Sequence, residues 1–298
     1  MSMTTRLTQN PALRSTTVWS LAYQTLGGGI IYPLLTLACV VPSRAGAYWA
    51  SGRAVSPSHA RALLPAVALG YIAPTVLMYA PFPRSDDADA DANDVTQLKI
   101  AAWQFAPVYV NALLFLLTFS LYPSGPTSSP AGAGRRNNVE ADIPALKRLY
   151  WALYLVAAVT HAGVLAAILG PWNADPARVS LGAIFVPSGA RRVPESPFQA
   201  VHYVFQWDVW GIYGAGLLWC LVELHDLLRL GVGRSDAGAG SGSGTGFRML
   251  AALAATALVF AVGSVAIGPA AVMAAFWLWR EDKLALVERR LGTRAKLA

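Results

Sequence analysis

The sequence has few charged residues. Only 13% of the 298 residues are Asp, Glu, Lys or Arg, about half the charged share of a soluble domain, while 55% are hydrophobic. So few charges cannot cover the surface of a water-soluble globule of this size. The high hydrophobic content also excludes a disordered chain. The composition therefore favours a membrane protein.

The sequence is also poor in the residues of disulfide frameworks and cofactor motifs. Its two cysteines, Cys39 and Cys220, both lie in apolar runs, and their spacing indicates neither a disulfide framework nor a zinc site. No P-loop, GxSxG, HExxH or CxxC motif is present. The acidic stretch SDDADADAND is not a DDxxD motif and lacks the Gly and the closing Glu of a calcium loop. We therefore expect a solvated loop there, and neither a metal nor a cofactor.

Basic residues exceed acidic ones, which gives a formal net charge of +7. They lie in short loops and a tail between long apolar runs. This distribution favours a membrane surface over nucleic acid as the partner. We therefore expect membrane lipid as a partner and no nucleic acid.

Six apolar stretches each approach or exceed the roughly 20 residues that a membrane helix needs. The last stretch is interrupted by Gly268-Pro269, where we expect one helix to break and a second to begin. The sequence therefore predicts an all-α fold: a polytopic bundle of six or seven transmembrane helices in one integral-membrane domain over residues 1–298. The stretches are 17–41, 62–81, 100–122, 149–170, 201–224 and 249–279.

Prolines inside these stretches predict kinks or broken helices. They are Pro33, Pro65, Pro74 and Pro107. The first apolar stretch is too long for the apolar region of a signal peptide and is expected to be an uncleaved first span. We expect a multi-pass protein of the endoplasmic reticulum membrane.

The connections between the stretches are rich in Pro, Gly, Ser or charge. Flexible loops are predicted at 82–99, 123–148 and 231–246, and a charged C-terminal tail at 280–298. Phe276, Trp277 and Trp279 would lie at the membrane interface before that tail. An apolar island, SLGAIFVP, lies in the connection 171–200 and is expected to dip into the interface.

Asp208 is the carboxyl that lies deepest in any predicted span. The helical period places Gly211, Ala215 and Trp219 near its face, which suits a pocket beside the acid. A carboxyl in a low-dielectric site favours its protonated form and can act as a proton donor. The alternatives are that Asp208 bonds a neighbouring helix for structural reasons or that it lies in a water-filled vestibule.

Two further ionisable residues in the spans are candidates for catalysis. Glu223 lies fifteen residues after Asp208, about 22 Å along the helix, so the two cannot act on one substrate atom. Glu223 either pairs with a group on another helix or extends to the interface. His161 either orients a substrate oxygen or bonds a backbone carbonyl.

Neutral polar and aromatic residues of the spans are candidates for substrate binding, and the alternative is helix packing. They are Trp103, Gln104, Tyr109, Asn111, Trp207 and Trp219.

The segments GGGIIYPLL, ARALLPAVALGYIAPTVLMYAP, WQFAPVYV and FQWDVWGIYGAGLLW resemble, in order and spacing, fungal integral-membrane terpene cyclases of meroterpenoid pathways. The resemblance covers roughly residues 20–225 and is to the longer-chain group acting on farnesyl-phenol epoxides. It implies a bundle that protonates an epoxide or terminal alkene of a prenylated, hydrophobic isoprenoid substrate. The carbocation then cyclises without metal or diphosphate loss.

The resemblance implies a proton donor, and Asp208 fits it. A related shorter group uses a Glu from an early span with a late Asp. This chain has no Glu before Glu140, so the partner of Asp208 stays open.

Two other classes of function stay open. One is a membrane transporter or lipid-binding protein without chemistry, although no internal repeat of the kind that transporters show is present. The other is a subunit or scaffold of a membrane complex. The sequence leaves open the substrate, the ring formed, the stereochemistry, the membrane orientation and the oligomeric state.

Overall fold

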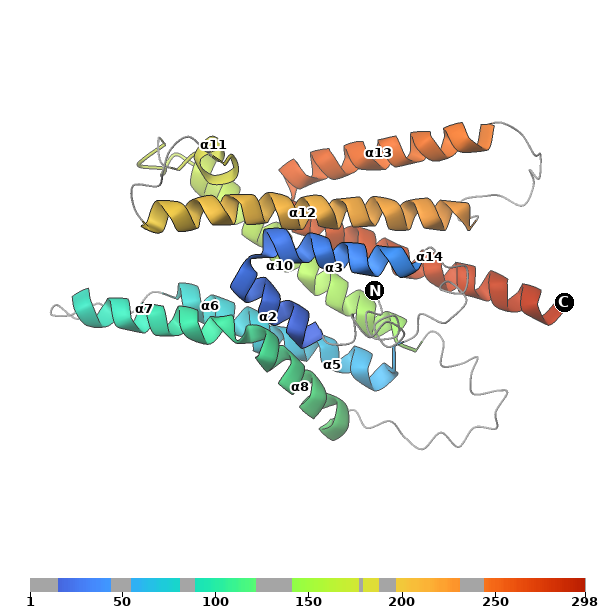
Figure 1. The fold of residues 1–298 in the computed structure, drawn as a ribbon, viewed down its shortest axis with the longest axis horizontal. Helices are drawn as coiled ribbons and strands as arrows, with labels where there is room; N and C mark the ends of the chain where they lie inside the picture. The colour runs from blue at the N-terminus through green and yellow to red at the C-terminus, as the bar shows by residue number, and fades with distance from the viewer. Residues whose placement is uncertain are drawn as a thin grey trace. The chain divides into compact units, whose positions relative to one another are not determined.

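The computed structural model describes residues 16–43, 55–80, 89–121, 141–176, 179–187, 197–230 and 244–297. Within these ranges every regular element is a helix (Figure 1), which confirms the all-α prediction. The chain forms two compact units. One joins Thr25–Arg53 to Tyr150–Ala298, and the other joins Ser2–Gln24 to Ala54–Leu149.

The first unit is arranged around one long helix, α12. This helix contacts α3, α11, α13 and α14, and α3 runs along it in Figure 1. The part of α10 that follows Leu149 belongs to the same unit. The bounds are α3 Gly28–Ser43, α10 Ile143–Leu169, α11 Leu181–Phe185, α12 Pro197–Arg229, α13 Gly244–Ala266 and α14 Pro269–Leu297.

The second unit holds a run of three continuous helical segments against which α8 packs. Gly70 permits this contact, because a Cβ atom there would lie 2.7 Å from the backbone nitrogen of Val110. The last two residues of α2, Thr25 and Leu26, are assigned to the first unit. The bounds are α2 Thr16–Leu26, α5 Pro57–Val67, the π-helix η2 Ala68–Ile72, α6 Ala73–Tyr79, α7 Asp89–Gln104 and α8 Ala106–Ser120.

Four described helices are long and apolar enough to cross a membrane. A fifth candidate is the pair Val95–Gln104 and Ala106–Ser120, if the two form one span bent by 54°. Length and composition thus support a membrane protein with four or five candidate spans, and the count of six to seven stays a prediction. The four are Pro57–Tyr79, Ile143–Leu169, Gln199–Arg229 and Gly246–Ala266.

Two of the predicted helix breaks are confirmed. Gly268 has a φ of +92°, a conformation that only glycine adopts readily, and separates α13 from α14. Before Pro107 the chain bends by 54° between α7 and α8. Pro107 therefore lies in the first turn of α8, where the missing N–H of proline leaves no helical hydrogen bond unmade.

Two expectations about helix continuity were wrong. The first apolar stretch is not one helix, because Gly27 has a φ of +91° and ends α2 before α3 begins. Each piece is shorter than a full span. Pro33, by contrast, lies inside α3 without a break. Between Pro65 and Pro74 the helical run continues through the wider turn η2.

Parts of the predicted loops and tail are helical. The 82–99 segment is helical from Asp89 onward, and the 123–148 segment from Ile143. Residues 122–140 and 231–243 lie outside the described residues. The predicted C-terminal tail continues α14 to Leu297, and its first two residues are buried, as described below.

Candidate functional site

Asp208, on α12, joins the start of α3 through both of its carboxylate oxygens. Gly29 N donates to Oδ1 at 2.8 Å, and Gly28 N donates to Oδ2 at 3.3 Å. The first N–H groups of a helix have no acceptor within it. Asp208 therefore caps the N-terminus of α3 from a neighbouring helix, where the helix dipole favours negative charge.

Glycines explain why α3 and the helix carrying Asp208 approach so closely. A Cβ atom at Gly29 would lie 2.9 Å from Asp208 Oδ1 and 3.1 Å from Asp208 Cα. A Cβ atom at Gly211 would lie 2.6 Å from Gly29 Cα. The Gly27-Gly28-Gly29 run thus supplies the turn, two capped N–H groups and the tight contact. Close approach at small residues is typical of helix pairs in membranes.

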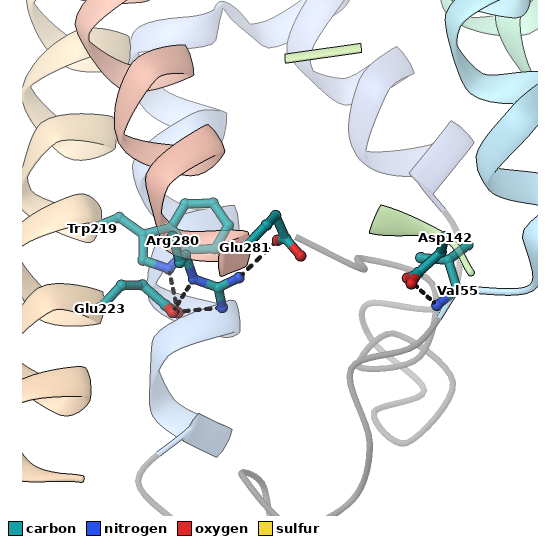
Figure 2. A network of polar contacts seen from close by, with 6 residues as sticks. All are labelled: Val55, Asp142, Trp219, Glu223, Arg280 and Glu281. Carbon is teal, nitrogen blue, oxygen red and sulfur yellow. Dashed lines mark hydrogen bonds and ion pairs between the residues drawn. The ribbon is translucent and has the colours of Figure 1, made fainter. Parts of the chain in front are cut away.

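Glu223 pairs with a residue of another helix, the first of its two alternatives. Figure 2 shows its carboxylate meeting the guanidinium of Arg280 from α14. Arg280 Nε and Nη2 lie 2.7 and 2.6 Å from Glu223 Oε2, and Arg280 Nη1 donates to Glu281 Oε1 at 3.3 Å. All three side chains are at most 3% exposed. Arg280 was not predicted as a site residue, because a charge directly after an apolar run is typical of a tail.

Two tryptophans pack against this ionic cluster. Trp219 Nε1 donates to Glu223 Oε1 at 3.3 Å, and the Arg280 guanidinium lies 4.7 Å from the ring centroid of Trp277. The two indole rings meet edge to face at 5.1 Å. Burial lowers the pKa of Arg280, but the carboxylates of Glu223 and Glu281 outweigh burial and raise it overall. Arg280 is thus a permanent cation held between the carboxylates of Glu223 and Glu281.

His161 bonds a backbone carbonyl, the structural one of its two alternatives. Its Nε2 lies 3.0 Å from the carbonyl oxygen of Val265. Because a carbonyl only accepts, Nε2 carries the hydrogen. Val265 is in the last turn of α13, whose carbonyls have no helical partner. His161 therefore caps the helix end that the break at Gly268 creates.

The predicted binding residues of the second unit have local partners or are exposed. Asn111 Nδ2 donates to the Pro107 carbonyl at 2.7 Å, an oxygen one turn earlier in the same helix. Trp103 Nε1 donates to Thr75 Oγ1 at 2.9 Å. Gln104 and Tyr109 are exposed. Of these four residues, Trp103 thus joins two helices, Asn111 bonds its own helix, and Gln104 and Tyr109 are exposed.

Two predicted tryptophans of the first unit differ in environment. Trp207 is 54% exposed and meets Tyr203 edge to face at 6.3 Å, whereas Trp219 is buried in the ionic cluster. Of the predicted site residues, the structure brings Glu223 and Trp219 into contact. Among the described residues there is no group of three or more His, Cys, Asp and Glu side chains that could hold a metal ion.

Comparison with known proteins identifies the family. A family model described as the CtvD domain matches residues 5–286. The chain belongs to this family. All the predicted site residues and the Glu223–Arg280 pair fall within the range that the CtvD domain covers.

Among curated proteins, the CtvD-domain chain is similar to one named terpene cyclase ascI, from Acremonium egyptiacum. The two are 26% identical over 152 residues, which is 50% of this chain and 36% of the relative. The chain therefore matches about a third of the length of that relative. No solved structure matches the chain.

Proposed function

We propose that the protein is a multi-pass membrane terpene cyclase of the endoplasmic reticulum that protonates an epoxide or alkene of a prenylated substrate and so starts carbocation cyclisation. The CtvD domain and the similarity to a protein named terpene cyclase support this class. The observation that carries the proposal is Asp208, a partly buried carboxyl inside the candidate span Gln199–Arg229 that is held by the start of α3.

Asp208 is better suited than Glu223 to donate a proton. Glu223 shares a buried ion pair with Arg280 at 2.6 Å, so its carboxylate is already engaged by the guanidinium and is not available to a substrate. The partners of Asp208 are two neutral backbone N–H groups. Neutral donors permit both the acid and its conjugate base, which a general acid needs in each turnover.

In the proposed mechanism the two oxygens of Asp208 have different roles, in line with their unequal hydrogen bonds. Oδ1 keeps its 2.8 Å bond to Gly29 N throughout. Oδ2, with the longer 3.3 Å bond to Gly28 N, carries the proton. As the proton moves to the epoxide oxygen, both N–H groups and the α3 dipole stabilise the carboxylate that forms.

The proposed reaction balances without a co-reactant. The proton binds the epoxide oxygen, the C–O bond breaks, and the carbon left positive is attacked by an alkene of the same chain. The cyclised cation loses a proton, so the product is an isomer of the substrate, and Asp208 is reprotonated for the next turnover. Aromatic faces stabilise cations, and the partly exposed Trp207, adjacent to Asp208 in the chain, is the first candidate for this role.

The test is product formation in membranes that contain equal amounts of wild type and variants, supplied with prenylated phenol epoxides. Wild type should give an isomer of unchanged mass. Asp208→Asn keeps an acceptor for Gly29 N but has no acidic proton. It should lose about 10²–10⁴-fold in rate or more, the size of a general-acid contribution.

Asp226→Asn is the matched control, because it makes the same change on the same helix beyond the apolar stretch, where Asp226 lies 3.2 Å from His225 Nδ1. It should keep most of the activity. A near wild-type rate from Asp208→Asn contradicts the assignment of the acid. A wild-type protein that binds prenylated lipids but yields no isomer contradicts the cyclase itself and favours a lipid-binding protein.

A further inference from the structure

The segment between α10 and α12 has an unusual distribution of polar contacts. Its helix α11 has five residues, so nearly every backbone group in it lies near a helix end. At the start, Ser180 Oγ accepts from Ala183 N at 3.1 Å. Within the turn, Ile184 N donates to the Ser180 carbonyl, and Val186 N donates to the Gly182 carbonyl.

The four carbonyl groups of residues 183–186 would be orphans in an isolated turn. Each instead accepts a hydrogen bond from a side chain of α12, and the three donors follow one another at intervals of four residues on one face of that helix. The pairs are His202 Nε2 with Ala183 at 2.9 Å, Gln206 Nε2 with Ala183 at 2.7 Å, Ile184 at 3.3 Å and Val186 at 3.2 Å, and Trp210 Nε1 with Phe185 at 2.7 Å.

Two apolar side chains of the segment are exposed, whereas Ile184 and Phe185 are partly buried. Leu181 is 46% exposed and Val186 58%. On α12 beside them, Phe205 and Trp210 are also exposed, whereas Gln206, the residue that donates to three carbonyls, is buried. A loop in water shows the reverse pattern, with hydrated carbonyls and apolar groups turned inward. In hydrocarbon there is no water, so every backbone N–H and C=O group must form its hydrogen bond within the protein.

The position of α11 along α12 agrees with this environment. Trp210 lies eleven residues after Gln199, where the candidate span begins. Eleven residues of helix extend about 16 Å, roughly half of a hydrocarbon core of about 30 Å. The carbonyls that His202, Gln206 and Trp210 cap therefore lie alongside the first half of this candidate span.

We propose that residues 179–187 form a re-entrant segment embedded in the bilayer, with lipid acyl chains covering Leu181 and Val186. The side chains of His202, Gln206 and Trp210 replace water as donors to its carbonyl groups. The segment is thus part of the membrane-embedded body rather than an aqueous loop. This proposal does not depend on the cyclase reaction.

The test uses full-length protein in liposomes, with one cysteine introduced at a time and a membrane-impermeant maleimide supplied on both faces. The native thiols, Cys39 and Cys220, are buried and give a low background. The thiolate is the reactive form and requires water, so Leu181→Cys and Val186→Cys should react at least about tenfold more slowly than a cysteine in water. Both positions are exposed, so these changes leave the packing intact.

Two further introduced cysteines give reference labelling rates, one for water and one for lipid. Ala174→Cys is the water control, since Ala174 is exposed beside Asp175 in the same connection. Leu258→Cys is the lipid control, since Leu258 is exposed in the candidate span Gly246–Ala266. Rates at 181 and 186 near that of Leu258→Cys support the proposal, and rates near that of Ala174→Cys overturn it.

A second variant tests the role of the carbonyl caps. Gln206→Leu removes the donor to three carbonyl groups, which in hydrocarbon raises the free energy of the embedded segment. Added to Leu181→Cys, it should increase the labelling rate toward that of the water control. In water the freed carbonyl groups would be hydrated at little cost, so an unchanged rate contradicts the proposed role of Gln206.

Discussion

The buried pair of Glu223 and Arg280 gives the sharpest prediction for stability. Arg280→Met keeps an unbranched apolar side chain but removes the cation from two carboxylates, Glu223 at 2.6 Å and Glu281 at 3.3 Å. Removing one partner of a buried ion pair costs about 3–5 kcal/mol, because the remaining charge loses its compensation. At about 2 °C per kcal/mol for a chain of this size, Tm should fall by about 6–10 °C.

The assay is thermal unfolding in detergent followed by tryptophan fluorescence, because Trp219 and Trp277 lie against the pair. Lys283→Met is the matched control. Lys283 is also a cation on α14 over an aromatic ring, 5.8 Å from that of Trp279, but it is only partly buried. A cation–π contact at an exposed site is worth about 0.5–1 kcal/mol, so Tm should fall by about 2 °C or less.

A companion variant separates the charge from the packing. Arg280→Met combined with Glu223→Leu and Glu281→Leu removes all three charges and fills similar volumes. Apolar replacement of a whole buried ionic cluster is often neutral or stabilising, so this variant should recover most of the lost Tm. The reasoning is refuted if Arg280→Met lowers Tm no more than Lys283→Met does. It is also refuted if the triple variant has the lowest Tm of the set.

Two further predictions concern packing and capping. Gly211→Ala should cost about 1–3 kcal/mol, because its Cβ atom would lie 2.6 Å from Gly29 Cα, whereas Gly214→Ala, with nothing within 4 Å, should be neutral or stabilising; equal Tm values for the two would contradict the close contact. Asp142→Ala should cost about 1–3 kcal/mol, because the buried Val55 N donates to Asp142 Oδ2 at 3.0 Å (Figure 2). Asp142→Asn keeps an acceptor, so its Tm should fall less than that of Asp142→Ala. A larger fall in Tm for Asp142→Asn than for Asp142→Ala would refute this account.

Features set by local backbone chemistry were predictable from the sequence. The break at Gly268-Pro269 follows from the conformational range of glycine and the missing N–H of proline, and it is present. The same reasoning applied to Gly27 would have divided the first apolar stretch. The prediction of one span there rests on hydrophobicity, which carries no information on backbone angles. Periodicity and length identified the apolar helices, but they did not fix how many cross a membrane.

The partners of the polar side chains were less predictable, because they lie far apart in the chain. Glu223 and Arg280 are separated by 57 residues, and nothing near either residue specifies the other. The sequence left the partner of Asp208 open, and its partners are the backbone N–H groups of Gly28 and Gly29. Backbone donors exist at every residue except proline, so sequence alone does not show which ones a helix end leaves unsatisfied.

The separation of Glu223 from Arg280 also has a consequence for biogenesis. A ribosome adds about 5–20 residues per second, so about 3–11 s pass between the synthesis of Glu223 and that of its cation 57 residues later. During that interval α12 can be offered to the insertion machinery while its carboxylate still lacks the guanidinium. A nascent chain stalled before Arg280 should therefore hold the end of α12 near the aqueous boundary, and the arrival of α14 should draw it into its final position.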